Sequence, residues 1–464
     1  MTKVAPVALP ELEAFLRTYA HLFKREPTRR SVERYLTGLF TDLSRKTCDT
    51  IAEVVAGTTT QRLHNMLADA DWDSGELDET RVRRLAAESP EAGILILDDT
   101  GQVKQGRCSV GVARQYSGTL GKVGNCQVIV TAEYMADDLH SSTPLHWPVA
   151  ARLYLPEAWA NDAERRSKAY VPEELTFQKK PEIALDLVKR ARDWGVPFRF
   201  VVADAGYGDS TGFIAGLEEQ QVLYVCGVES TFGVRKPEEV QVAEAAPPPE
   251  YQGNGRPRLP RPAPLYTAKE IAESLPEEAW QTVTWREGTK GTLSRQFAAV
   301  RMHWGKGNPA LDRPKVSSMA TGPEGWLLLE RPLPGKDGDP KWYYSNLPAD
   351  TSLKRLVALA HARWVIEQFY REAKGECGFD NYQGRSWHGL HRHLALSMLS
   401  YTFLVQQRAG NSRQPEGGFS PLRLRDDPAG CTQASVGLVA QRPATVALGD
   451  QLNLAFQTNE KLTK

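Results

Sequence analysis

Hydrophobic positions in the first ninety residues recur at helical spacing. In PELEAFLRTYAHLF (residues 10–23) the leucine and aromatic side chains fall three and four positions apart, and TRRSVERYLTGLFTDL (28–43) continues the pattern. This spacing is typical of amphipathic helices that pack one face inward. Strand-like alternation is missing from this part of the sequence. We therefore predict a helical N-terminal domain over residues 1–90.

The pattern changes after residue 90 to short apolar runs typical of buried strands. These runs are GILILDDT (93–100), CQVIVTAEYM (126–135), WPVAARLYLP (147–156), FRFVVADAGYG (198–208) and VLYVCGV (222–228). Two helical segments separate the later ones, PEIALDLVKRARDWG (181–195) and TGFIAGLEEQQ (211–221). This order predicts an antiparallel meander of three strands, followed by parallel strands added on the other side of the sheet.

The rest of the chain divides into three parts. Residues 230–265, with VRKPEE and the proline-rich run PPPEYQGNGRPRLPRPAP, predict an irregular loop, and the rest of residues 230–348 predicts a β-rich insertion. Residues 349–408 return to helical periodicity and would complete the domain that residues 91–229 begin. A Gly/Pro-rich tail follows at 409–464. The predicted fold class is α/β, with a mixed sheet flanked by helices and interrupted by the insertion.

Composition and charge exclude only a few classes of function. Lys and Arg number 57 and so do Asp and Glu, so any surface for an anionic partner must be local. The six cysteines form no C-x-x-C pair, which argues against a zinc site and against a disulfide framework. We see no signal peptide, and the most apolar helix, near residues 394–405, is too short to span a membrane. We expect a cytoplasmic protein with no membrane partner.

Three acids stand where chemistry could occur. Asp99 and Asp204 each end a buried strand, and Glu367 lies in the helical stretch HARWVIEQFYREAK (361–374). Taken singly, a strand-end Asp caps a turn and Glu367 pairs with Arg363 on a solvated face. Taken together, each pair of converging carboxylates would repel by about 4 kcal/mol at about 4 Å and an effective dielectric of about 20. A hard divalent cation, Mg²⁺ or Mn²⁺, would relieve this repulsion, and we expect a pair of such ions.

These motifs resemble a known family. DDTGQVKQGRCSVGVARQYSGTLGKVGNCQV is similar to the first-aspartate region of DDE insertion-sequence transposases, and VVADAG to their second-aspartate strand. Arg363-x3-Glu367-x6-Lys374 is similar to the Y-x2-R-x3-E-x6-K signature of the cut-and-paste bacterial group, with Ala360 where the signature has tyrosine. The resemblance covers roughly residues 90–408. It implies a ribonuclease H-like catalytic domain, and Tyr370 is a guess for the missing tyrosine.

By position, the resemblance implies that Asp99, Asp204 and Glu367 are catalytic metal ligands. Asp98 is adjacent, but strand alternation points it to the opposite side, and the family's Asp-Thr pair selects Asp99. Arg363 and Lys374 would contact DNA phosphate. Further DNA contacts are expected from Arg371 on the same helix, from four basic residues of a glycine-rich segment, and from an aromatic of the insertion that stacks on a flipped base. These residues are Lys104, Arg107, Arg114, Lys122, Trp285 and Trp304.

For each of these predicted DNA contacts, a purely structural role is the alternative. The glycine-rich segment could be a hairpin loop whose basic residues face water, and either tryptophan could belong to the core. The implied function is metal-dependent cleavage of double-stranded DNA at the ends of an insertion element, then transfer of the 3′-OH into target DNA. A homodimer in the synaptic complex is implied by the family alone, and the N-terminal helices could add DNA binding. The rival hypotheses are a nuclease that only hydrolyses and a domesticated transposase that binds DNA without cutting it.

Overall fold

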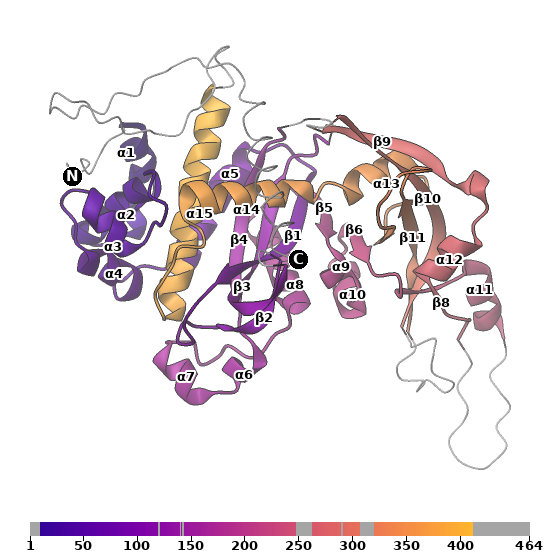
Figure 1. The fold of residues 1–464 in the computed structure, drawn as a ribbon, viewed down its shortest axis with the longest axis horizontal. Coiled ribbons are helices and arrows are strands. Elements are labelled where there is room, and N and C mark those ends of the chain that lie inside the picture. Colours follow the sequence, from indigo (N-terminus) through magenta and orange to yellow (C-terminus); the bar gives the residue numbers. More distant parts are fainter. Residues whose placement is uncertain are drawn as a thin grey trace, which may run out of the picture.

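A long mixed sheet forms the centre of the fold (Figure 1). The computed structural model describes residues 10–118, 121–139, 141, 143–246, 262–288, 291–306 and 320–411. Within these residues the sheet has twelve strands: β1 (Gly93–Val103), β2 (Ala113–Ser117), β3 (Lys122–Met135), β4 (His146–Tyr154), β5 (Phe198–Ala203), β6 (Leu223–Val228), β7 (Gly233–Arg235), β8 (Tyr266–Thr267), β9 (Gln281–Gly288), β10 (Gly291–Gly305), β11 (Thr321–Arg331) and β12 (Lys341–Ser345).

Helices surround this sheet. Those before and within its first half are α1 (Pro10–Arg17), α2 (Glu26–Leu39), α3 (Cys48–Val54), α4 (Thr60–Ala68), α5 (Ser74–Glu88), α6 (Glu157–Ala160), α7 (Ala163–Lys168), α8 (Lys180–Asp193), α9 (Ala205–Gly208) and α10 (Thr211–Glu219). Those that follow are α11 (Pro237–Ala245), α12 (Ala268–Ser274), α13 (Leu353–Ala360), α14 (Trp364–Cys377) and α15 (Trp387–Asn411). Short 3₁₀ turns lie at Ala20–Leu22 and Glu277–Ala279.

The strand pairing of the first half matches the predicted topology. β1 pairs antiparallel with β3, and β3 pairs antiparallel with β4, which gives the expected meander. β5 then adds parallel to β1, and β6 parallel to β5, through the helices α8 and α10. The mixed α/β class is therefore confirmed, and the order agrees with a ribonuclease H-like sheet. The sequence missed β2, which forms a hairpin with the first part of β3.

The insertion continues the same sheet. β12 pairs antiparallel with β6, and β11, β10 and β9 follow in turn, so that backbone hydrogen bonds join the two halves. The segment predicted as an irregular loop also carries structure: β7 and α11 occupy part of residues 233–245, and β7 pairs with β10. That part of the prediction was wrong, while residues 247–261 lie outside the described residues. Most of the predicted tail, 412–464, lies outside them too.

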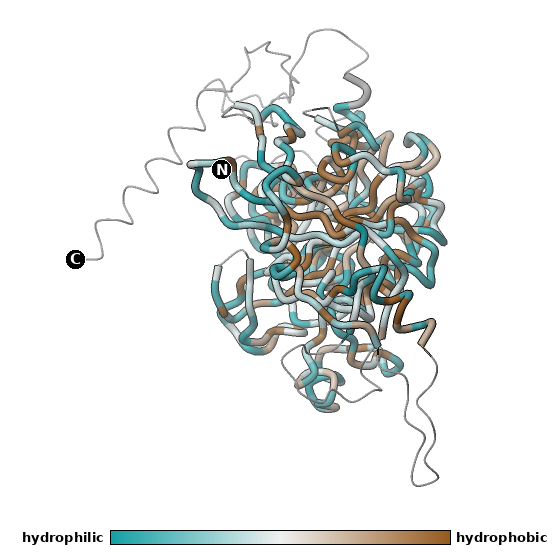
Figure 2. The backbone as a smooth tube through the Cα atoms, turned by 90° about the vertical axis from the view of Figure 1, so that its right-hand side faces the viewer, coloured by the Kyte–Doolittle hydropathy of each residue, from teal (hydrophilic) through white to brown (hydrophobic). Residues whose placement is uncertain are grey.

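Apolar positions gather in the interior, and polar positions lie on the outside of the body (Figure 2). The N-terminal helices pack against α15, so that Phe15 and Phe40 both meet Phe403. Within the described residues, no helix combines the length and apolar character needed to cross a membrane. The division into domains at residues 90, 229, 348 and 408 stays a prediction.

A buried arginine joins α5 to the sheet. Arg81 is fully buried, donates two hydrogen bonds to Asp78, and reaches the main-chain carbonyl oxygens of Pro148 and Val149 on β4. A buried charge is tolerated only when its hydrogen-bonding groups are satisfied, and here the partners come from two elements. Arg81 therefore fixes the helical N-terminal region on the sheet.

We predict that Arg81→Met strongly destabilises the protein. The substitution leaves the carboxylate of Asp78 buried without its partner, which typically costs about 3–5 kcal/mol. Chemical denaturation measures the loss. Arg83→Met on the same helix is the matched control, because Arg83 forms an exposed pair with Glu79 worth at most about 1 kcal/mol. Equal losses for the two variants would contradict the assignment.

Candidate active site

Two neighbouring aspartates on β1 point to opposite faces of the sheet. Asp99 accepts hydrogen bonds from Lys180 at the start of α8 (2.8 Å) and from the hydroxyl of Tyr207 (3.2 Å). Asp98 instead pairs with Arg363, the residue that precedes α14 (2.6 Å). The alternation predicted for this strand is therefore observed, but Asp98, not Asp99, faces the helix that carries Glu367. The structure adds Asp98 as a candidate that strand alternation and the Asp-Thr pair had set aside.

Asp204 follows β5 and caps the short helix α9. Its carboxylate accepts a hydrogen bond from the main-chain N–H of Gly206 (3.0 Å). The glycine-rich turn after it packs tightly on β6, because a Cβ on Gly208 would lie 2.0 Å from the carbonyl oxygen of Gly227. The glycines of this turn thus allow close packing between α9 and the sheet, which holds Asp204 at the end of β5.

The helix that carries the signature begins later than predicted. Residues 361–363 form the turn between α13 and α14, and α14 starts at Trp364 with Arg363 as its N-cap residue. Its expected apolar side is confirmed as buried; the side chains are Ala362, Ile366, Phe369 and Ala373. Glu367 lies in the first turn of α14, and its side chain is 62% exposed. Ala360, at the place of the signature tyrosine, is a buried residue at the end of α13.

Arg363 links the acids. Its guanidinium donates to Asp98 (2.6 Å) and to Glu367 (2.9 Å), so one cation bridges the strand acid and the helix acid. Asp204 is the next carboxylate close enough to influence it electrostatically. Further along α14, Lys374 donates to Thr100 on β1 (2.7 Å). The basic side of α14 therefore faces the polar end of β1 at these two residues, while Arg371 is exposed.

Burial and neighbouring charges shift the pKa values of Asp98, Asp204 and Arg363. Burial raises the pKa of Asp98 to about 7; Arg363 opposes this rise, and the negative charges of Asp204 and Asp99 add to it. Burial also raises the pKa of Asp204. Burial alone would lower the pKa of Arg363, but the three carboxylates around it raise the pKa overall. Each shift has the direction that burial and neighbouring charges produce when several carboxylates lie close to one arginine.

The donor chemistry of this space suits a hard divalent cation, since carboxylates are the ligands that Mg²⁺ and Mn²⁺ prefer. The geometry does not yet suit one: among the described residues, no three His, Cys, Asp or Glu side chains are placed to hold a metal ion together. Arg363 and Lys180 are engaged with the acids instead. A metal would have to take over interactions that these two side chains now make.

The remaining predicted DNA contacts are dispersed. Lys104 donates to the carbonyl oxygen of Tyr382, and burial lowers its pKa to about 8, so the fold already uses this side chain. Arg107, Arg114 and Lys122 are exposed on the β1–β2–β3 hairpin region, which agrees with the hairpin alternative and leaves them accessible to a ligand. Their role in DNA binding stays a prediction.

The two tryptophans of the insertion lie in different settings. Trp304 is only 6% exposed, and its indole N–H donates to Glu218 (3.0 Å), as in the core alternative. Trp285 stacks on His361 with ring centroids 4.0 Å apart, which covers one of its faces. Tyr370, the guess for the signature tyrosine, has its hydroxyl on Thr131 of β3. Base stacking by either tryptophan stays a prediction.

Sequence reasoning missed three residues at this site. Lys180 and Tyr207 contact Asp99, and Arg286 of β9 stacks over Trp364 at 4.0 Å. Burial lowers the pKa of Arg286, and the charge of Glu367 acts in the opposite direction. Tyr207 follows Asp204 within the ADAGYG turn, so its position was a usable signal. Nothing in the local sequence could connect Arg286 with a helix that starts 78 residues later.

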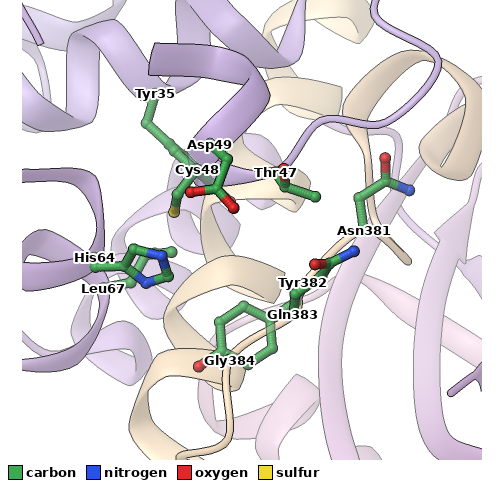
Figure 3. A pocket seen from close by; sticks show the side chains of 10 residues that line it. All are labelled: Tyr35, Thr47, Cys48, Asp49, His64, Leu67, Asn381, Tyr382, Gln383 and Gly384. Carbon is green, nitrogen blue, oxygen red and sulfur yellow. The ribbon is translucent and has the colours of Figure 1, made fainter. Parts of the chain in front are cut away.

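A small cavity of about 20 Å³ lies elsewhere, between the N-terminal helices and the segment after α14 (Figure 3). Tyr35, Cys48 and His64 line one side, and Asn381 and Tyr382 the other. It has room for about one water molecule, and none of the acids described above lines it. We do not count it as part of the site.

Comparison with known proteins gives the family. A family model described as DDE superfamily endonuclease matches residues 18–292, which is more than half of the chain. The chain belongs to the DDE superfamily endonucleases. The chain is also 32% identical over 224 residues to a probable transposase for insertion sequence element IS701 from Microchaete diplosiphon. That match covers 47% of this chain and 54% of the relative, so the chain spans about half the length of the curated relative that it matches.

The family match includes only some of the candidate acids of this DDE endonuclease. Asp98, Asp99 and Asp204 lie inside the matched residues, whereas Glu367 and the Arg363–Lys374 signature lie beyond them. The contribution of α14 to the site is supported by the geometry around Arg363 instead.

We predict that Arg363→Gln makes the DDE endonuclease more responsive to divalent cations. Without the guanidinium, Asp98 and Glu367 lose their shared partner, so the Tm in the absence of metal should fall by a few degrees. Millimolar Mg²⁺ should then raise the Tm more than it does in the wild type, because binding to the folded state stabilises it.

The matched control is Arg408→Gln, which removes a different arginine–carboxylate pair, with Glu372 at 2.8 Å. Its Tm response to Mg²⁺ should equal that of the wild type. A response of Arg363→Gln no larger than this control would contradict competition between Arg363 and a metal.

Proposed function

We propose that this DDE endonuclease is an insertion-sequence transposase that cleaves DNA at the ends of its element and joins the freed 3′-OH to target DNA. The observation that carries the proposal is the set of acids around Arg363: Asp98 of β1 and Glu367 of α14 pair with it, and Asp204 acts on it electrostatically. Asp99, the β1 acid that the motif selects, lies close enough to Asp204 to raise its pKa. Family membership and the transposase relative support it. The finer assignment to the group with the Y-R-E-K signature rests on Arg363, Glu367 and Lys374 alone, because Ala360 departs from it.

In this proposal Asp99, Asp204 and Glu367 would hold Mg²⁺ or Mn²⁺, as a pair of ions; Asp99 would first have to leave Lys180, with which it pairs on the opposite face from Glu367. When bound, such ions supply an activated oxygen nucleophile and stabilise the leaving oxygen. Asp98 acts as a positioning residue, since its bond to Arg363 sets the direction of the guanidinium. Once its bonds to the carboxylates are broken, Arg363 can donate two parallel hydrogen bonds to a phosphate. Lys374 adds a positive point charge along the same helix.

The proposed substrate is double-stranded DNA, both the terminal inverted repeats of the element and the target. The exposed basic residues Arg107, Arg114, Lys122 and Arg371 are placed on the surface and could contact its phosphates. Two copies of the chain would hold the two ends together in a synaptic dimer. These roles extend the family assignment and depend on the test below.

The test uses labelled duplex DNA that carries the terminal repeat of the element, with Mg²⁺ or Mn²⁺. We predict cleaved and strand-joined products for the wild type, and background levels for Asp99→Asn, Asp204→Asn and Glu367→Gln. Asp98→Asn should retain part of the activity, because it orients Arg363 and holds no metal in this proposal. Gel separation of cleaved and joined products measures both steps.

Glu376→Gln is the matched control, because Glu376 is an exposed glutamate on the same helix as Glu367. If Asp99→Asn is fully active and Asp98→Asn is inactive, the metal ligand on β1 is Asp98 and not Asp99. Cleaved DNA without joined products would indicate a hydrolytic nuclease. Tight binding to the ends with no cleavage in either metal would indicate a DNA-binding protein descended from a transposase.

A further inference from the structure

The β-rich insertion places one arginine near Glu367 by means of an irregularity in its hairpin. In the pairing of β9 with β10, Leu293 faces Arg286 and the next residue, Ser294, faces Thr284. Trp285 is therefore an extra residue on β9, as in a β-bulge. Bulges rotate side chains out of strict alternation and occur often next to active sites.

The bulge directs two consecutive side chains to the turn between α13 and α14 and to the first residue of α14. Trp285 stacks on His361 at 4.0 Å with an interplanar angle of 16°. Arg286 lies over the ring of Trp364, also at 4.0 Å. His361 and Trp364 lie two residues before and one residue after Arg363, the residue that bridges the acids, so the insertion contacts the chain next to this cation.

Arg286 differs from most arginines in the described strands of the insertion; Arg235 of β7 also lacks an ion pair, but it is only 2% exposed and donates to the carbonyl oxygen of Ala263. Arg295, Arg301 and Arg331 each form an ion pair with a glutamate, at Glu330, Glu324 and Glu277 respectively. Among the described residues no carboxylate lies within ion-pair distance of Arg286, and its Nε is buried without a hydrogen-bond partner. The contact with Trp364 restrains the guanidinium, and the side chain as a whole stays partly exposed.

We propose that Arg286 contacts a phosphate of the DNA strand held at Glu367, so that the insertion supplies a cation to the site. A phosphodiester is the ligand that fits, because it is anionic and its paired oxygens match the fork of an arginine. This inference rests on the proposed function, since it takes DNA as the substrate. Arg286 is a binding and positioning residue here, and the acids carry the chemistry.

The salt dependence of DNA binding tests this directly. Affinity for the labelled terminal-repeat duplex is measured by fluorescence anisotropy over a range of salt concentrations. A variant that neutralises one phosphate fewer should reduce the slope of log affinity against log salt by about 0.9 for B-form DNA. We expect that reduction for Arg286→Gln, and a slope near that of the wild type for Arg286→Lys, which keeps the charge.

Arg331→Gln is the matched control, because Arg331 also stacks on a tryptophan of the insertion, Trp280 at 4.2 Å, but has its own glutamate partner. Its slope should equal that of the wild type. An unchanged slope for Arg286→Gln overturns the proposal, and a lowered Tm with that unchanged slope would assign Arg286 to packing α14 alone. If the wild type shows no salt-dependent binding to the probe, the proposed function fails together with this inference.

Discussion

The site depends on one constraint: carboxylates that meet from separate elements need a cation between them. Asp98 comes from β1, Asp204 from the end of β5 and Glu367 from α14, and Arg363 is the cation that interacts with all three. Lys180 serves Asp99 on the other face of the sheet. The guanidinium thus satisfies in this structure the electrostatic demand that a divalent ion would satisfy more strongly.

The architecture explains how such distant residues meet. Parallel pairing of β1 with β5 brings their ends to one edge of the sheet, and the glycine contact between Gly208 and Gly227 seats α9 close beside it. The apolar side of α14 is buried, which leaves Arg363 and Lys374 against the polar end of β1. The same hydrogen-bonded sheet extends through β12 into the insertion, so the insertion is positioned by the first half of the sheet.

Much of this arrangement could be predicted from local pattern. Apolar runs indicated the strands of the meander, the two parallel strands and the helices between them, because hydrophobic periodicity reports which positions face a core. The apolar side of α14 was predicted for the same reason. The pattern failed at β7 and α11, where a short strand gains its stability from pairing with β10 and not from its own composition.

Local pattern is enough for the fold class, the apolar faces of the elements and the short list of acids. The neighbour that each acid has depends on how the elements pack. Alternation along β1 requires that Asp98 and Asp99 diverge, but it does not say which face α14 covers, since that depends on packing between segments more than 250 residues apart. Arg286 reaches the same turn only through a bulge and a sheet edge that no local pattern encodes.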